Sequence, residues 1–162
     1  MKVTEQIARQ FREVNFGGNW TAVNLKESLA DINWVQATTQ VNTFNTIAAL
    51  VYHINYYVGI ALKVLKEEPF NAKDKYSFNL PPIQSQEDWG NLLDKTWRDA
   101  EIFAMLVEQF PEAKLEEIFI HEKYGNYYRN FHGIIEHTHY HLGQIVLIKK
   151  LLTQNSHEQD LG

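Results

Sequence analysis

The chain has 162 residues and a mass of 19.0 kDa, enough for one domain with a hydrophobic core and too few for two domains of ordinary size. Its net charge of −5 and its lack of any Lys- and Arg-rich stripe argue against a nucleic-acid partner. Because it contains no Cys, the chain cannot form disulfides or supply thiolate metal ligands or a thiol nucleophile.

The N-terminal region lacks the apolar core of a signal peptide, and no run of about 18 apolar residues occurs anywhere in the chain. We therefore expect a soluble, cytoplasmic protein without a membrane partner. The aromatic content of 13% requires large packed surfaces, and no repeat or low-complexity tract divides the sequence. A single domain over residues 1–162 is expected.

Helical periodicity predicts an all-α domain in which four long helices carry most of the core. The first helix is predicted over residues 4–14, before Gly17 and Gly18, and a short amphipathic turn follows within residues 25–32. The second is predicted to begin near Asn42 or Thr43 and to end at Pro69. Its apolar stripe consists of Ile47, Leu50, Ile54, Val58, Ala61 and Leu65.

The third predicted helix opens at Ser85, where a capping-box pattern begins, and ends at Pro111. The fourth is predicted over residues 126–152, with Lys149 and Lys150 placed favourably near its C-terminal dipole. The inward positions of the third helix are Trp89, Leu93, Ala100, Phe103 and Val107.

The link between the second and third helices, residues 69–86, is longer than an antiparallel connection needs. Fully extended, it reaches roughly 60 Å, whereas the preceding helix is about 36 Å long. Such a crossover predicts that the second and third helices run parallel, which gives a four-helix bundle of up-down-down-up order. A loose surface loop is the alternative.

The stretch HTHYH places three histidines within five residues, at His137, His139 and His141. A strand would put all three on one face, but the flanking pattern is helical and too long for a strand. In a helix His137 and His141 lie one turn apart, and His139 points away from them together with His132. The apolar residues on the face of His137 and His141 are Ile134, Ile145, Ile148 and Leu152.

Two histidines at i and i+4 can bind one divalent cation, with the ion about 2.1 Å from each nitrogen. A third ligand is available at His53, in the middle of the apolar second helix. A shared metal would satisfy one nitrogen of each buried ring, since an unpaired buried polar group costs about 1–3 kcal/mol. Alternatively, tyrosine hydroxyls and backbone carbonyls satisfy these histidines.

In this pattern the chain resembles the DinB/YfiT-like family of bacterial four-helix metalloproteins over essentially its whole length. The resemblance rests on a central His53 in the second helix and on an H-x-x-x-H pattern followed by G-Q-I at residues 137–145. It implies parallel second and third helices, a three-histidine site of His53, His137 and His141, and a homodimer. Leu142 stands where relatives often have Arg, which leaves the three ligands unaffected.

The resemblance also implies a cofactor, a divalent metal ion, with zinc or nickel favoured and iron or copper compatible. Three neutral histidines leave the ion an open position for a small-molecule substrate. The expected activity is that of a hydrolase or of a transferase that uses a low-molecular-weight thiol. The alternative is a noncatalytic dimeric metal-binding bundle with a structural or stress-response role.

Three carboxylates are candidates for a general base, namely Asp94, Glu101 and Glu136, although solvated surface charge also explains each of them. Gln144, about one turn from His141, is a candidate for orienting a ligand or a water molecule, with helix packing as the alternative. Tyr52 and Tyr56 are candidates for a subunit contact.

Overall fold

The computed structural model describes residues 1–159, with side chains described up to Gln154. The described part of the chain is helical and contains no strand, which confirms the all-α prediction. Six α-helices are present there: α1 (Val3–Phe16), α2 (Leu25–Leu29), α3 (Trp34–Thr38), α4 (Ile47–Leu65), α5 (Gln86–Glu108) and α6 (Tyr127–Gln159). Three 3-10 turns are η1 (Asp74–Tyr76), η2 (Glu112–Lys114) and η3 (Glu122–Tyr124).

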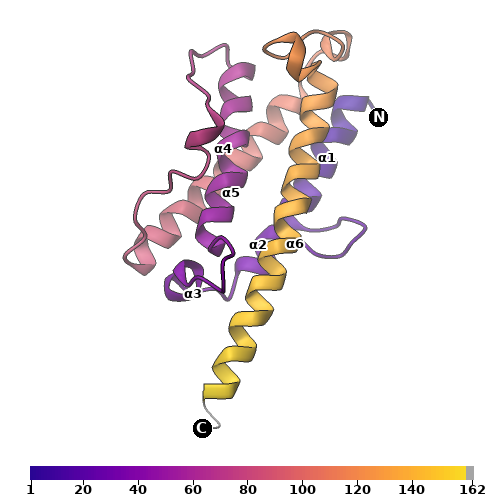
Figure 1. Cartoon of the computed structure of the whole chain (residues 1–162). Coiled ribbons are helices and arrows are strands. Elements are labelled where there is room, and N and C mark those ends of the chain that lie inside the picture. Colours follow the sequence, from indigo (N-terminus) through magenta and orange to yellow (C-terminus); the bar gives the residue numbers. More distant parts are fainter. Residues whose placement is uncertain (160–162) are drawn as a thin grey trace.

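The four long helices contact one another in a ring, in which α1 and α4 each pack against both α5 and α6. In Figure 1, α1 and α6 run from the top of the view to the bottom, whereas α4 and α5 run upward. The crossover, residues 66–85, leaves the upper end of α4 and returns to its lower end, where α5 starts. It therefore covers α4 along its length.

Local capping explains where the helices begin. The side chain of Ser85 accepts a hydrogen bond from the backbone N–H of Asp88, as the sequence predicted for the start of α5. The predicted start of α4 near Asn42 or Thr43 is wrong, because Asn42 has a φ of 49° and lies in a turn, and Thr46 caps the helix instead. α3 was not predicted; Asn33 and Gln36 form a capping box at its start.

Aromatic side chains fill the centre of the core. The ring of Phe103 on α5 meets Phe11 on α1 edge to face at 4.8 Å between centroids, and meets Phe131 on α6 at 5.8 Å. Trp89 is fully buried, and its indole N–H donates to the carbonyl of Ile32 at 2.8 Å. The other predicted inward residues of α5 are buried as well, except Leu93, which is partly buried and packs against the core, and Leu92 beside it is also buried.

The helix α4 is long and apolar enough to cross a membrane, but 56% of its apolar stretch is buried inside the protein. All of its predicted stripe from Ile47 to Ala61 is buried, and Leu65 is partly buried. Such burial is also typical of the central helix of a water-soluble protein. Its hydrophobicity is accounted for by packing within the chain.

Candidate metal centre

Three histidines from two helices meet between α4 and α6. The Nε2 atom of His137 lies 3.1 Å from Nε2 of His53 and 3.1 Å from Nε2 of His141. The potential ligand atoms of the three residues all lie within 4.8 Å of one another. His53 and His141 are buried, and His137 is partly buried. The structure thus brings together the three residues that the sequence suggested, close enough to hold one metal ion.

Two hydrogen bonds orient the rings of this cluster. The Nδ1 atom of His53 lies 3.3 Å from the backbone carbonyl oxygen of Ser77 in the crossover. A carbonyl only accepts, so Nδ1 of His53 carries the proton and its Nε2 presents a lone pair. In the same way, Nδ1 of His141 donates to Oε1 of Gln144 at 2.7 Å, so Nε2 of His141 is unprotonated and presents a lone pair.

The arrangement of these lone pairs fits a cation. A neutral His137 that protonates Nε2 can donate to only one of its two neighbours, which leaves the other lone pair unsatisfied. Two nitrogens that each lie about 2.1 Å from one ion at ordinary coordination angles are about 3.0–3.4 Å apart. The two separations from Nε2 of His137, 3.1 Å each, fall in this range, and the ligand atoms of all three residues lie within 4.8 Å of one another. The donor set therefore suits a divalent ion that accepts imidazole ligands, among which zinc, nickel, copper and iron all qualify.

Comparison of the chain with models of protein families, with curated proteins and with solved structures finds no match. The resemblance to the DinB/YfiT-like family therefore rests on the motif residues themselves.

Replacing Gln144 by leucine is expected to weaken zinc binding by about 10–100-fold, the usual effect of losing a partner that orients a ligating histidine. The hydrogen bond of Gln144 sets both the tautomer and the ring angle of His141. Isothermal titration of zinc into the metal-free protein measures the change. Gln144→Glu, which keeps an acceptor at this position, should bind zinc nearly as well as the wild type; equal weakening in both variants would contradict the assignment.

Aromatic rings enclose the cluster on the side of the crossover. Phe78 stacks on the ring of His53 with 3.9 Å between centroids and 11° between planes. The edge of Tyr57 contacts both His53 and His137, and its hydroxyl donates to Oδ1 of Asp74 at 3.3 Å. Burial raises the pKa of Tyr57, so its phenol stays protonated at neutral pH.

Burial also governs the protonation of the histidines. Desolvation, with a further contribution from the neighbouring rings of His141 and His53, lowers the pKa of His137 from its usual 6.5 to about 4. Burial is likewise the main cause of a lowered pKa at His53. Both rings are thus neutral at neutral pH, which is the form that binds a metal.

The metal-free protein is therefore expected to lose stability as the pH falls. Between about pH 6.5 and about pH 4, His137 takes up a proton in the unfolded chain but not in the folded one, so acid favours unfolding. Stability from this source is present above pH 6.5 and is lost as the pH falls toward 4. Urea unfolding of the wild type and of His137→Gln across this range tests the effect. A pH dependence as steep in the variant as in the wild type would contradict it.

The remaining candidates from the sequence lie in different places. His139 points away from the cluster, as predicted, and its Nδ1 donates to the carbonyl of Ile135. Glu101 forms an ion pair with Arg12 at 3.0 Å. Asp94 is exposed on α5, whereas Glu136 lines a cavity together with His137. Of the three candidate general bases, only Glu136 therefore shares a cavity with a histidine of the cluster.

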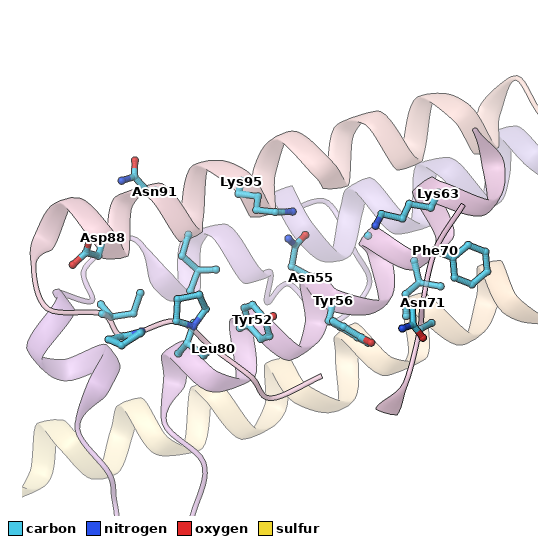
Figure 2. A pocket seen from close by; sticks show the side chains of 17 residues that line it. Tyr52, Asn55, Tyr56, Lys63, Phe70, Asn71, Leu80, Asp88, Asn91 and Lys95 are labelled. Atoms are coloured by element: carbon cyan, nitrogen blue, oxygen red, sulfur yellow. The ribbon is translucent and has the colours of Figure 1, made fainter. Parts of the chain in front are cut away.

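Two cavities adjoin α4. A cavity of about 690 Å³ opens beside His137 and Tyr57. The other, of about 510 Å³, lies under the crossover between α4 and α5, and Figure 2 shows Asn55, Lys63 and Lys95 among the side chains that line it. No histidine of the cluster lines this second cavity, so the cavity beside His137 is the one that connects to the candidate metal centre.

Tyr52 and Tyr56, the candidates for a subunit contact, lie beside the crossover of the same chain. Both residues are partly buried and line the cavity under the crossover. The hydroxyl of Tyr56 donates to the carbonyl of Lys73 and accepts from its N–H, at 2.9 and 3.1 Å. Tyr56 thus binds the crossover, and Tyr52 lines the cavity beneath it.

Sequence reasoning missed the crossover residues that complete the site. Ser77 contributes only a backbone carbonyl, which any residue type provides, so no side-chain pattern marks it. Phe78 was visible only as part of the general aromatic excess. The one available signal was the length of the crossover, which requires that it run back along α4 and hence past His53.

Proposed function

We propose that the chain is a divalent-metal-dependent enzyme of the DinB/YfiT-like type, folded as a four-helix bundle of up-down-down-up order and acting in the cytoplasm. The ring of contacts among α1, α4, α5 and α6 and the common direction of α4 and α5 support the bundle. The reaction is hydrolysis of a small molecule, or transfer to or from a low-molecular-weight thiol.

One observation carries this proposal. The lone pairs of His53 and His141 are directed at Nε2 of His137 by hydrogen bonds that lie outside the cluster. A closed structural zinc site has four protein ligands, whereas this cluster offers three and adjoins a cavity at His137. Three ligands with access to a cavity are the arrangement of a catalytic centre.

A divalent ion held by three imidazoles supplies Lewis acidity and lowers the pKa of a water molecule or thiol that reaches it. The chain supplies the other functions. Glu136 forms no ion pair within the described side chains and lines the cavity, so its carboxylate is available to accept a proton. The phenol of Tyr57 lines the same cavity; its hydrogen is donated to Asp74, so its oxygen is left to accept a hydrogen bond from a substrate.

The experiment that tests this function begins with protein purified without an affinity tag. Elemental analysis is expected to find about one divalent ion per chain. Loaded protein is then screened for ester and amide hydrolysis and for thiol transfer, with His137→Ala as the inactive control. Turnover should fall by about 100-fold or more in Glu136→Gln while the metal content stays unchanged. Metal retained without turnover of any substrate would favour the noncatalytic alternative.

We further propose that the protein is a homodimer. The outer face of α6 near the cluster exposes Tyr140 (66%) and Leu147 (54%). Phe44, which lines one cavity with Leu147, is 44% exposed. Large apolar side chains that gather on one face are typical of an interaction surface. Sedimentation equilibrium of the wild type and of Leu147→Glu tests the contact, and a monomeric wild type would overturn it.

A further inference from the structure

The cavity beside His137 is a groove along the outer side of α6. Its lining consists of Tyr57, Tyr128, Arg129, Asn130, His132, Gly133, Ile134, Glu136 and His137. All of these except Tyr57 belong to the first three turns of α6. Its volume of about 690 Å³ falls within the usual range for small-molecule sites.

Gly133 contributes no side chain to the lining of the groove. Glycine weakens a helix interior relative to alanine, so a glycine at this place calls for a reason. Close packing is not the reason, because a Cβ atom at Gly133 would meet nothing within 4 Å. Gly133 lies one turn from Arg129 on one side and one turn from His137 on the other. The missing side chain therefore leaves an open path between these two residues.

Arg129 places a positive charge at the far end of this path. Its side chain is exposed, and it forms no ion pair with any carboxylate in the described part of the chain. Eight residues separate Arg129 from His137, which corresponds to about 12 Å along the helix axis. The side chain of Arg129 extends toward the helix N-terminus over Gly125, so its guanidinium lies at least this far from His137 along the axis.

The groove is also polarised along its length. Glu136 adjoins His137 and puts a negative charge at the end near the histidine cluster, whereas Arg129 occupies the opposite end. Arg129 attracts an anionic group at the end away from the cluster, where a guanidinium offers paired donors that match a carboxylate. A ligand that binds the metal through one end therefore gains a second attachment if its other end is a carboxylate.

We infer that the substrate of the three-histidine site is an elongated small molecule with a carboxylate group about 10 Å from its reacting group. Arg129 binds the carboxylate, and the connecting chain lies across Gly133. This inference rests on the proposed metal-dependent function, because the reacting group is placed at the cluster. It specifies the substrate class that the groove selects.

A matched pair of metal-binding probes tests the inference without knowledge of the reaction. One probe is the monohydroxamic acid of suberic acid, whose hydroxamate binds zinc and whose tail ends in a carboxylate; the other is its methyl ester. Calorimetry with zinc-loaded protein should show about tenfold tighter binding of the acid than of the ester. Arg129→Gln should abolish this preference, whereas Arg98→Gln, at an exposed arginine of α5 outside the groove, should keep it.

A second pair of variants tests the path. Gly133→Leu should weaken both probes by about tenfold or more, with zinc stoichiometry unchanged, because its side chain fills the groove. Gly90→Leu, at a glycine of α5 that likewise has open space above it, should leave both affinities unchanged. Gly133→Ala, which favours the helix, gives a smaller effect in the same direction should the leucine variant fail to fold.

Distinct results separate this inference from the proposed function. Equal binding of acid and ester by the wild type, or an undiminished preference in Arg129→Gln, overturns the role of Arg129 and leaves the metal centre in place. Unchanged binding by Gly133→Leu overturns the path across Gly133. If neither probe binds a protein that holds zinc, the centre lacks an open position, and both the proposed function and this inference fail.

Discussion

Replacing His137 by alanine is expected to abolish stoichiometric binding of a divalent metal. His137 is the member of the cluster whose Nε2 faces both other rings, at 3.1 Å from each. Its loss leaves two ligands, one on α4 and one on α6. The affinity for the metal should therefore fall by more than about 100-fold, the upper value for losing a residue that only orients a ligand. Equilibrium dialysis against zinc, followed by elemental analysis, measures the bound ion.

Two further variants make this test specific. His53→Ala should lose binding as completely as His137→Ala, because it removes the only ligand supplied by α4. His139→Ala should bind normally, since its ring donates to the helix backbone and lies outside the cluster. Circular dichroism controls for folding. Equal losses in all three variants would show that the helical phase of HTHYH, and with it the site, is wrong.

Replacing Phe103 by alanine is expected to cost about 3–5 kcal/mol of unfolding free energy, the usual range for a buried aromatic residue. Phe103 is fully buried on α5 and contacts Phe11 of α1 and Phe131 of α6. The substitution would therefore create a cavity where three helices meet. This loss is a large part of the stability of a domain of this size. Urea unfolding with a two-state fit measures it.

Met105→Ala provides the matched control on the same helix. Met105 is 43% exposed, so its truncation should change the unfolding free energy by no more than about 0.5 kcal/mol. The loss of unfolding free energy in Phe103→Leu should lie between those of Phe103→Ala and Met105→Ala. A Phe103→Ala variant as stable as Met105→Ala would mean that the aromatic contacts of the core are not formed.

Periodicity predicted the long helices because each has one apolar face, and the same argument placed His53, His137 and His141 inward. The predicted ends of the helices were less accurate where the backbone conformation determines them. The left-handed conformation of Asn42 delays α4 to Ile47, and α6 continues as helix to Gln159, beyond the predicted end at residue 152. Neither feature changes the apolar pattern from which the helices were inferred.

The surroundings of the site were less accessible to prediction because they depend on how distant segments pack. Glu101 could be assigned to an ion pair only when α1 was seen to bring Arg12 beside it. Gln144 was predictable because its partner lies one turn away on the same helix. Contacts within a helix follow from spacing alone, whereas contacts between segments require the path of the crossover.

The hydrogen bond from His53 to the carbonyl of Ser77 has a consequence for how such a chain can change over time. A main-chain oxygen survives any substitution at its position, so drift in the amino acid at residue 77 would leave the imidazole held as before. An insertion or deletion between Pro69 and Ser85 would instead shift which oxygen faces the ring. This hydrogen bond therefore depends on the length of the segment, whereas most exposed loops tolerate insertions and deletions.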